Sequence, residues 1–136
     1  MNLLAQLKRD EGLRLTAYRD TVGKLTIGYG RNLDDNGITQ AEADLMLIND
    51  IASHEAQVHN FLPWTDSLDE VRRTVLVNMA FNMGIHSLLG FRNTLQAIHD
   101  GEFDRAADLM LESKWAEQVG PRAHRLANQI RMGAWQ

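Results

Sequence analysis

Two carboxylic acids and a threonine lie close together near the start of the chain. Eight residues separate Glu11 from Asp20, and five separate Asp20 from Thr26. Hydrolysis of a glycosidic bond uses one carboxyl to donate a proton and a second to assist water from the opposite side. The spacing therefore allows glycoside hydrolysis. It is equally typical of a solvated helix end, a turn aspartate and an ordinary strand threonine.

The local sequence gives the two carboxyls different surroundings. Asn2 can cap a helix whose leucines recur at helical spacing, and Gly12 supplies the residue that ends it. Glu11 would then lie at the negative end of the helix dipole, which favours its protonated form. Asp20 falls at a turn, where water and backbone N–H groups favour the ionised form. Acid–base hydrolysis requires such a contrast between two carboxyls.

The segment after residue 12 has the two-residue period of a β-hairpin. Along its second half large residues alternate with small ones, namely Leu25, Ile27 and Tyr29 with Thr26, Gly28 and Gly30. Residues 13–19 and 24–30 are predicted to pair, joined around Val22 and Gly23. Thr26 would lie on the bare face, where a polymer can approach the backbone closely.

The remainder of the chain is predicted to be helical after a turn at 34–37. Thr39 and Glu42 have the spacing of a capping box, and Ser67 and Glu70 repeat it. Helices are expected over 39–60, from Ser67 to Gly84, and near 92–99, 102–112 and 121–132. The predicted fold class is therefore α+β and mainly α-helical, with a small N-terminal β-hairpin and a larger helical part.

Composition and charge limit the class of protein. The 136 residues, 44% of them hydrophobic, suffice for one domain with a core. The absence of cysteine excludes disulfides, thiolate metal sites and cysteine nucleophiles. The net charge of −4 disfavours nucleic acid as a partner. We interpret a local basic cluster as a solvated helix face; it comprises Arg122, His124, Arg125 and Arg131. The histidines lack metal-ligand spacing, so neither a metal nor another cofactor is expected.

The block EGLRLTAYRDTVGKLTIGYG, which contains Glu11, Asp20 and Thr26, resembles the catalytic region of the bacteriophage lysozymes, glycoside hydrolase family 24. The resemblance continues in the same order through SLDEVRRTVLVNMAFNMG, GFRNTL and SKWAEQVGPRAHRLANQIRMGAW, and is closest to the T-even phage type. It implies a lysozyme-like bilobed fold in one domain over 1–136. The small, shortened β lobe would comprise 12–38, the connecting helix 39–60, and the helical lobe 1–11 with 61–136.

The resemblance also implies roles for single residues. Glu11 would protonate the leaving oxygen of the bond between N-acetylmuramic acid and N-acetylglucosamine in peptidoglycan. Asp20 and Thr26 would hold water on the opposite face, as in an inverting enzyme whose carboxyls lie about 6.5–9.5 Å apart. The implied substrate contacts are Phe81, Asn82, Asn93 and Thr94. The implied ion pairs are Arg122 with the acid and Asp10 with Arg125.

From residue types alone, Phe81 could equally be a core residue, and Asn93 and Thr94 could be helix caps. The chain also departs from the family pattern. The loop between Leu33 and Thr39 is short, so part of the β lobe's outer wall and of the glycan groove should be missing. Asn32 and Leu109 replace residue types expected to contact substrate.

Arg31 and the net charge are two further departures from the family. Arg31 stands where the T-even phage type has a histidine paired with an aspartate on the following helix, and we expect Arg31 to pair with Asp50 instead. The net negative charge should weaken electrostatic steering toward an anionic cell wall.

The predicted function is hydrolysis of peptidoglycan, leading to cell-wall lysis, by a monomer. A lytic transglycosylase would cut the same bond without water and would not need Asp20. A catalytically weak wall-binding protein with the same fold is the third alternative. The N-terminal stretch MNLLAQLKRDEG is too short and too charged for a signal peptide or a membrane span. The protein is therefore expected to be made in a host cytoplasm and to act at the wall, in the periplasm, without membrane insertion.

Overall fold

Helix α3 (Gln40–Phe61) begins with the predicted capping box. The Thr39 hydroxyl accepts a hydrogen bond from the Glu42 N–H (3.2 Å), and the Glu42 carboxylate accepts one from the Thr39 N–H (2.9 Å). This computed structural model describes residues 2–136. Contacts along the chain divide it into two units, one up to Met46 and one over Leu47–Gln136, and each is described by itself below.

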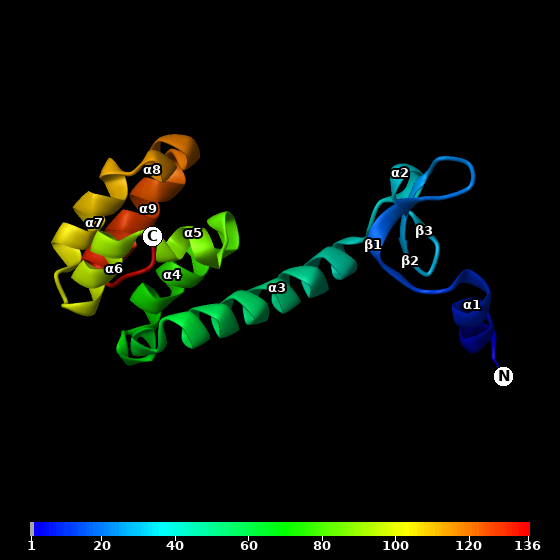
Figure 1. The fold of residues 1–136 in the computed structure, drawn as a ribbon, viewed down its shortest axis with the longest axis horizontal. Helices are drawn as coiled ribbons and strands as arrows, with labels where there is room; N and C mark the ends of the chain where they lie inside the picture. The colour runs from blue at the N-terminus through cyan, green and yellow to red at the C-terminus, as the bar shows by residue number, and fades with distance from the viewer. Residues whose placement is uncertain (1) are drawn as a thin grey trace. The chain divides into compact units, whose positions relative to one another are not determined.

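The first unit contains helix α1 (Leu3–Glu11) and a small sheet (Figure 1). Asn2 caps α1 by accepting a hydrogen bond from the Ala5 N–H (2.9 Å). Three antiparallel strands follow in the order β1-β2-β3, with the bounds Arg14–Arg19, Leu25–Gly28 and Arg31–Asn32. The predicted hairpin is confirmed. Its second strand is shorter than expected, because Gly28 and Gly30 adopt positive φ and turn the chain into β3.

The segment predicted as a turn at 34–37 forms one turn of helix, α2 (Leu33–Asn36). Asn32 caps this helix by accepting a hydrogen bond from the Asp35 N–H (3.0 Å). Two carboxylates in the first turn, Asp34 and Asp35, favour the helix through its dipole. Residues 34–37 have the composition of an irregular turn, but the cap and these two charges stabilise one turn of helix instead.

The second unit is helical and continues α3 with one 3₁₀ helix and six α-helices among the described residues. Their bounds are η1 Pro63–Ser67, α4 Glu70–Met83, α5 Ile85–Leu89, α6 Arg92–His99, α7 Phe103–Glu112, α8 Lys114–Val119 and α9 Pro121–Met132. The predicted capping box at Ser67 is wrong. Ser67 ends η1, and Asp69 caps α4 instead, because its carboxylate reaches the Arg72 N–H (3.0 Å).

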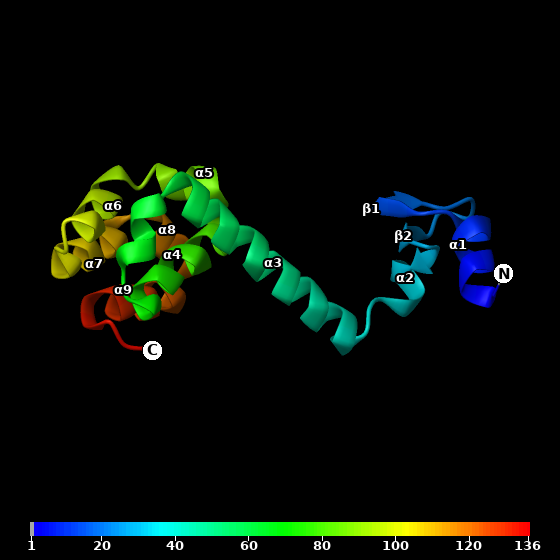
Figure 2. The same ribbon diagram turned by 90° about the horizontal axis from the view of Figure 1, so that it is seen from below.

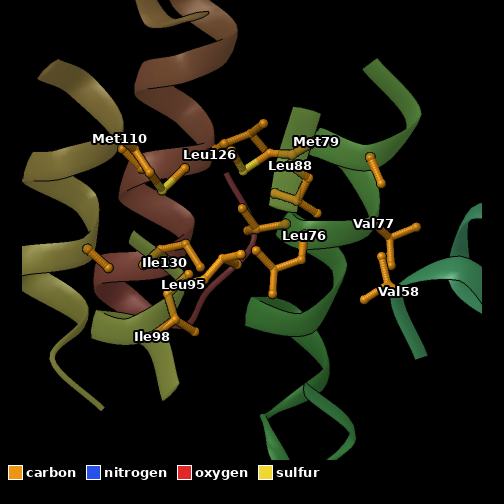
Figure 3. Close-up of a cluster of buried hydrophobic side chains, with 14 of the residues drawn as sticks. Val58, Leu76, Val77, Met79, Leu88, Leu95, Ile98, Met110, Leu126 and Ile130 are labelled. Carbon is orange, nitrogen blue, oxygen red and sulfur yellow. The ribbon is translucent and has the colours of Figure 1, made fainter. Parts of the chain in front are cut away.

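A continuous apolar core lies in the second unit (Figure 3). Helices α7 and α9 lie side by side in both ribbon views (Figures 1 and 2). Side chains from the seven helices α3 to α9 meet in the core. They include Trp115 of α8 and the residues labelled in Figure 3, which are Val58, Leu76, Val77, Met79, Leu88, Leu95, Ile98, Met110, Leu126 and Ile130. Within residues 2–136, every buried apolar side chain belongs to this unit. Hydrophobic stabilisation therefore comes chiefly from residues after position 57.

The arrangement confirms the predicted fold class, a mainly helical α+β protein with a small N-terminal sheet. Over residues 2–136, no helix combines the length and the hydropathy that crossing a bilayer requires. The allocation of residues 1–11 to the helical lobe, and the other lobe boundaries, stay predictions.

Candidate active site

Glu11 is the last residue of α1, and its carboxylate lies against a glycine. It shares a hollow of about 320 Å³ with apolar residues of α1, with Lys8 and with the turn at Tyr29 and Gly30. A Cβ atom on Gly30 would lie 2.7 Å from Glu11 Oε2, closer than van der Waals contact allows. The absence of a side chain at Gly30 therefore leaves room for the carboxylate where it lies.

Asp20 is held by the backbone of the turn that joins β1 to β2. Its Oδ1 accepts hydrogen bonds from the Val22 N–H (3.0 Å) and the Lys24 N–H (2.8 Å). The main chain closes the same turn, with Asp20 N–H donating to the Lys24 carbonyl (2.9 Å). The other carboxylate oxygen of Asp20 has no hydrogen-bond partner among residues 2–136. One oxygen is thus fixed and the other is available to a ligand.

Thr26 lies on β2, opposite Tyr18 of β1 and Asn32 of β3. Only 3% of it is exposed, in contrast to the open face that the alternation suggested, and its strand lies between β1 and β3 in the sheet. Its hydroxyl donates to the Lys24 carbonyl (2.8 Å). Lys24 therefore connects the two residues, with its N–H on Asp20 and its carbonyl on Thr26.

Arg31 makes a two-pronged ion pair with Glu42, with both nitrogen–oxygen distances 2.7 Å, and also donates to the Gly37 carbonyl (3.2 Å). The prediction named Asp50 instead. Glu42 is favoured because the capping box holds its carboxylate at the start of α3, whereas Asp50 lies about two turns further along the helix. The Arg31 guanidinium and the Thr39 N–H lower the pKa of Glu42 to about 2.

Asp10 accepts a hydrogen bond from Nε of its neighbour Arg9 (2.9 Å), and Nη2 of the same guanidinium forms an ion pair with Oδ1 (2.9 Å). The pair that the sequence analysis expected between Asp10 and Arg125 stays a prediction. So does the pair between Arg122 and the acid. Within the second unit, Arg122 binds the side chain of Asn78, whose Oδ1 accepts from its Nε (3.1 Å) and Nη2 (2.7 Å).

The predicted substrate contacts of the second unit fall into separate places. Phe81 and Arg122 line one hollow of about 350 Å³, where the Phe81 ring also meets the edge of His54 (centroids 5.3 Å apart). Asn93 and Thr94 line another of about 470 Å³. Asn82 instead holds the buried indole of Trp115, since its Oδ1 accepts from Nε1 (2.8 Å).

Sequence reasoning missed Gly30 and Asn78 as site residues. The positive φ of Gly30 (+76°) could have been anticipated from the two glycines around Tyr29, but its closeness to Glu11 could not. Asn78 lies one helical turn before Asn82 on α4, so helical spacing could have drawn attention to it.

A helix-terminal glutamate, a turn-bound aspartate and a buried threonine on a small antiparallel sheet, joined to a helical unit, define a lysozyme-like α+β protein. The model of the family described as phage lysozyme matches residues 8–131, and the chain belongs to this family. The family is one of lysozyme-type cell-wall hydrolases, which are glycosidases.

Individual relatives are similar over most of the chain. It is 28% identical to "Probable T4-type lysozyme 1" of Dictyostelium discoideum, over 93% of this chain and 92% of that protein. It is 30% identical to "Endolysin" of Acyrthosiphon pisum secondary endosymbiont phage 1, over 88% of this chain and 82% of that protein. It is also 29% identical to "Pre-baseplate central spike protein Gp5" of Enterobacteria phage T4. That match covers 98% of this chain but only 28% of the spike protein.

Proposed function

We propose that the protein hydrolyses the β-1,4 bond between N-acetylmuramic acid and N-acetylglucosamine in bacterial peptidoglycan, with inversion at the anomeric carbon. The observation that carries the proposal is the connection of Asp20 to Thr26 through the backbone of Lys24. One carboxylate oxygen of Asp20 has no hydrogen-bond partner among residues 2–136, and the Thr26 hydroxyl already donates its proton to the Lys24 carbonyl. Two acceptors held in this way suit a water molecule that must lose a proton as it attacks.

In this mechanism Glu11 acts as the general acid. It transfers its proton to the glycosidic oxygen, so the sugar leaves as a neutral alcohol. Water adds its oxygen to the anomeric carbon from the opposite face, and its proton passes to Asp20. Thr26 accepts a hydrogen bond from the same water, because its own proton is on the Lys24 carbonyl. A separation of about 6.5–9.5 Å between the carboxyls would leave room for that water.

Further contacts of the glycan strand are proposed for the second unit. Phe81 is 40% exposed and lines a hollow together with Asn78 and Arg122, which suits packing of its ring against a sugar face. Asn93 and Thr94 offer amide and hydroxyl groups for the sugar substituents. Asn82, which holds Trp115, is proposed as a further substrate contact. Arg122 is proposed to pair with Glu11, and Arg125 with Asp10. The protein would work as a monomer at the cell wall, without a cofactor and without binding nucleic acid.

Digestion of purified peptidoglycan by the wild type and Glu11→Gln tests the proposal, with product masses as the measurement. We expect hydrated muramic-acid ends from the wild type and a loss of rate of about 10²–10⁴-fold in Glu11→Gln, the usual worth of a general acid. Glu112→Gln is the matched control, because Glu112 also ends a helix and is exposed. It should retain full activity.

Two other outcomes would contradict the proposal. Products lighter by one water would carry anhydro ends and would indicate transglycosylation, in which Asp20 holds no nucleophile. A well-folded wild type that binds the wall and releases no products would indicate a binding protein, and the short segment between β3 and α3 would then be the first feature to extend.

A further inference from the structure

The central strand of the small sheet, β2, extends beyond the end of its short neighbour β3. Strand β3 covers β2 only at Thr26 and Ile27, which pair with Asn32 and Arg31. The chain then turns into α2, so no strand backbone of β3 reaches Leu25. Within residues 2–136, the Leu25 N–H therefore has no strand partner on this side of β2.

A side chain of α2 takes the place of the missing strand. Asp34 Oδ2 accepts a hydrogen bond from the Leu25 N–H (2.8 Å). The same oxygen lies 3.7 Å from the guanidinium of Arg19, the last residue of β1, and Arg19 donates in turn to the Gly23 carbonyl (3.0 Å). Asp34 thus contacts both strands on either side of the turn that contains Asp20.

The neighbouring carboxylate holds the residue between Asp20 and Thr26. Asp35 pairs with the Lys24 ammonium (3.0 Å) and accepts a second hydrogen bond from Asn32 (2.8 Å). The hydrogen bond between Lys24 and Asp35 raises the pKa of Lys24 and lowers that of Asp35. Both groups therefore stay charged over the range in which proteins are usually active.

We propose that Asp34 and Asp35 are positioning residues, which hold Lys24 and Leu25 and so fix Asp20 and Thr26 relative to each other. This role rests on the proposed function. The physical reason is that the Leu25 N–H bound by Asp34 belongs to the same peptide group as the Lys24 carbonyl. This carbonyl accepts hydrogen bonds from the Thr26 hydroxyl and from the Asp20 N–H. A rotation of that peptide group would displace the Lys24 carbonyl, and with it the contacts that fix Thr26 and Asp20 relative to each other.

Variants of Asp34 separate this role from a merely structural one. Asp34→Ala removes the acceptor for Leu25, whereas Asp34→Asn keeps an oxygen that can accept the same bond. With soluble, uncrosslinked glycan strands as substrate, we expect kcat of Asp34→Ala to fall about 10- to 100-fold, the effect of misplacing a reacting group. KM should stay within about twofold, because Asp34 would not touch the glycan. Asp34→Asn should recover most of kcat.

Two further measurements identify the cause. Amide hydrogen exchange at Leu25 should be faster in Asp34→Ala and close to the wild type in Asp34→Asn. Exchanging the charges of the second pair, in the double variant with Lys24→Asp and Asp35→Lys, should restore part of the kcat that Asp35→Lys loses. Asp44→Ala is the matched control, because Asp44 is an exposed carboxylate of the same unit and should leave kcat and Leu25 exchange unchanged.

The results distinguish this role from the proposed function. An active wild type with an unchanged kcat in Asp34→Ala would overturn the role of Asp34 alone. A raised KM with kcat intact would also overturn it, because Asp34 would then bind substrate. A wild type that releases no hydrated muramic-acid ends would overturn the proposed function and this role together.

Discussion

At the scale of single residues, the proposed chemistry depends on what the backbone leaves open around two carboxylates. Asp20 is held by two N–H groups of its own turn, which fix one of its carboxylate oxygens. Glu11 is not held in this way. It lies in the space that Gly30 leaves, so its position depends on a side chain that is absent.

Gly30→Ala should therefore displace the Glu11 carboxylate. A Cβ at this position would lie 2.7 Å from Glu11 Oε2, and the flexible glutamate would yield. We expect kcat on peptidoglycan to fall about 10- to 100-fold. Gly37→Ala is the control, since Gly37 also has a positive φ (+58°) but nothing lies within 4 Å of a Cβ there. Equal losses of activity in the two variants would show that backbone strain, and not the contact with Glu11, is responsible.

The ion pair of Arg31 with Glu42 should make stability depend on pH in the acid range. The pKa of Glu42 falls from 4.5 to about 2 on folding, so the pair is fully present above about pH 5. Its contribution is lost as the pH falls from about 4.5 toward 2, because the folded protein then takes up the proton that the unfolded chain already binds. Thermal unfolding of wild type and Glu42→Gln should differ above pH 5 and converge near pH 2. A constant difference over that range would contradict the assignment.

At the scale of elements, side chains close the ends and edges that the backbone leaves unpaired. Asp34 accepts a hydrogen bond from the edge of β2, and Arg72 donates hydrogen bonds to the C-terminal end of α9. The Arg72 guanidinium donates to the carbonyls of Ile130 (2.6 Å) and Arg131 (3.1 Å) and stacks over the Phe103 ring (3.7 Å). The last carbonyls of a helix have no partner within it, so these bonds tie α4 to α9.

Arg72→Lys should therefore lower the free energy of unfolding by about 1–3 kcal/mol. An ammonium group cannot serve two carbonyls and lie flat on a ring at the same time. Arg105→Lys is the matched control, because Arg105 is exposed and pairs only with Glu102 among the described residues. Chemical denaturation followed by circular dichroism gives the comparison. Equal midpoints for the two variants would remove Arg72 as a link between α4 and α9.

At the scale of the whole molecule, burial is uneven. All buried apolar side chains of residues 2–136 lie at or after Val58, and the first unit depends on hydrogen bonds, ion pairs and caps. The most sensitive positions for global stability are therefore in the second unit. The chemistry assigned to Glu11, Asp20 and Thr26 lies in the first, where local changes can alter activity with less effect on folding.

Leu76→Ala should destabilise the protein by about 2–5 kcal/mol, because it leaves a cavity in a fully buried position. Leu15→Ala is the control, since Leu15 is 80% exposed on β1 and should change stability by no more than about 0.5 kcal/mol. The measurement is denaturant unfolding monitored by tryptophan fluorescence, which reports the second unit through Trp64 and Trp115. Comparable losses in both variants would contradict a core confined to that unit.

Interactions between residues near each other in the chain could be predicted from the sequence. The caps at Asn2 and Thr39 and the β-hairpin depend on residue types at short fixed spacing, and they formed as expected. The position of Asp20 in a turn was also predicted from local residue types. The capping box predicted at Ser67 was wrong because a second capping residue, Asp69, lies two residues later and caps α4 instead.

The tertiary structure decided the partners that lie far apart in the chain. Three such contacts have no characteristic spacing in the sequence, because the fold and not the periodicity of a helix or strand brings the residues together. They are the hydrogen bond of Trp115 to Asn82, the hydrogen bond of Arg72 to the Ile130 carbonyl, and the position of Glu11 beside Gly30. Arg31 shows most clearly that the sequence alone did not predict which partner a charged residue takes. Its charge predicts an acidic partner, but Glu42 was selected over Asp50 because the capping box had already fixed the Glu42 carboxylate within reach. Residue types thus determined which chemistry the chain can perform, and three-dimensional proximity determined which groups hold it in place.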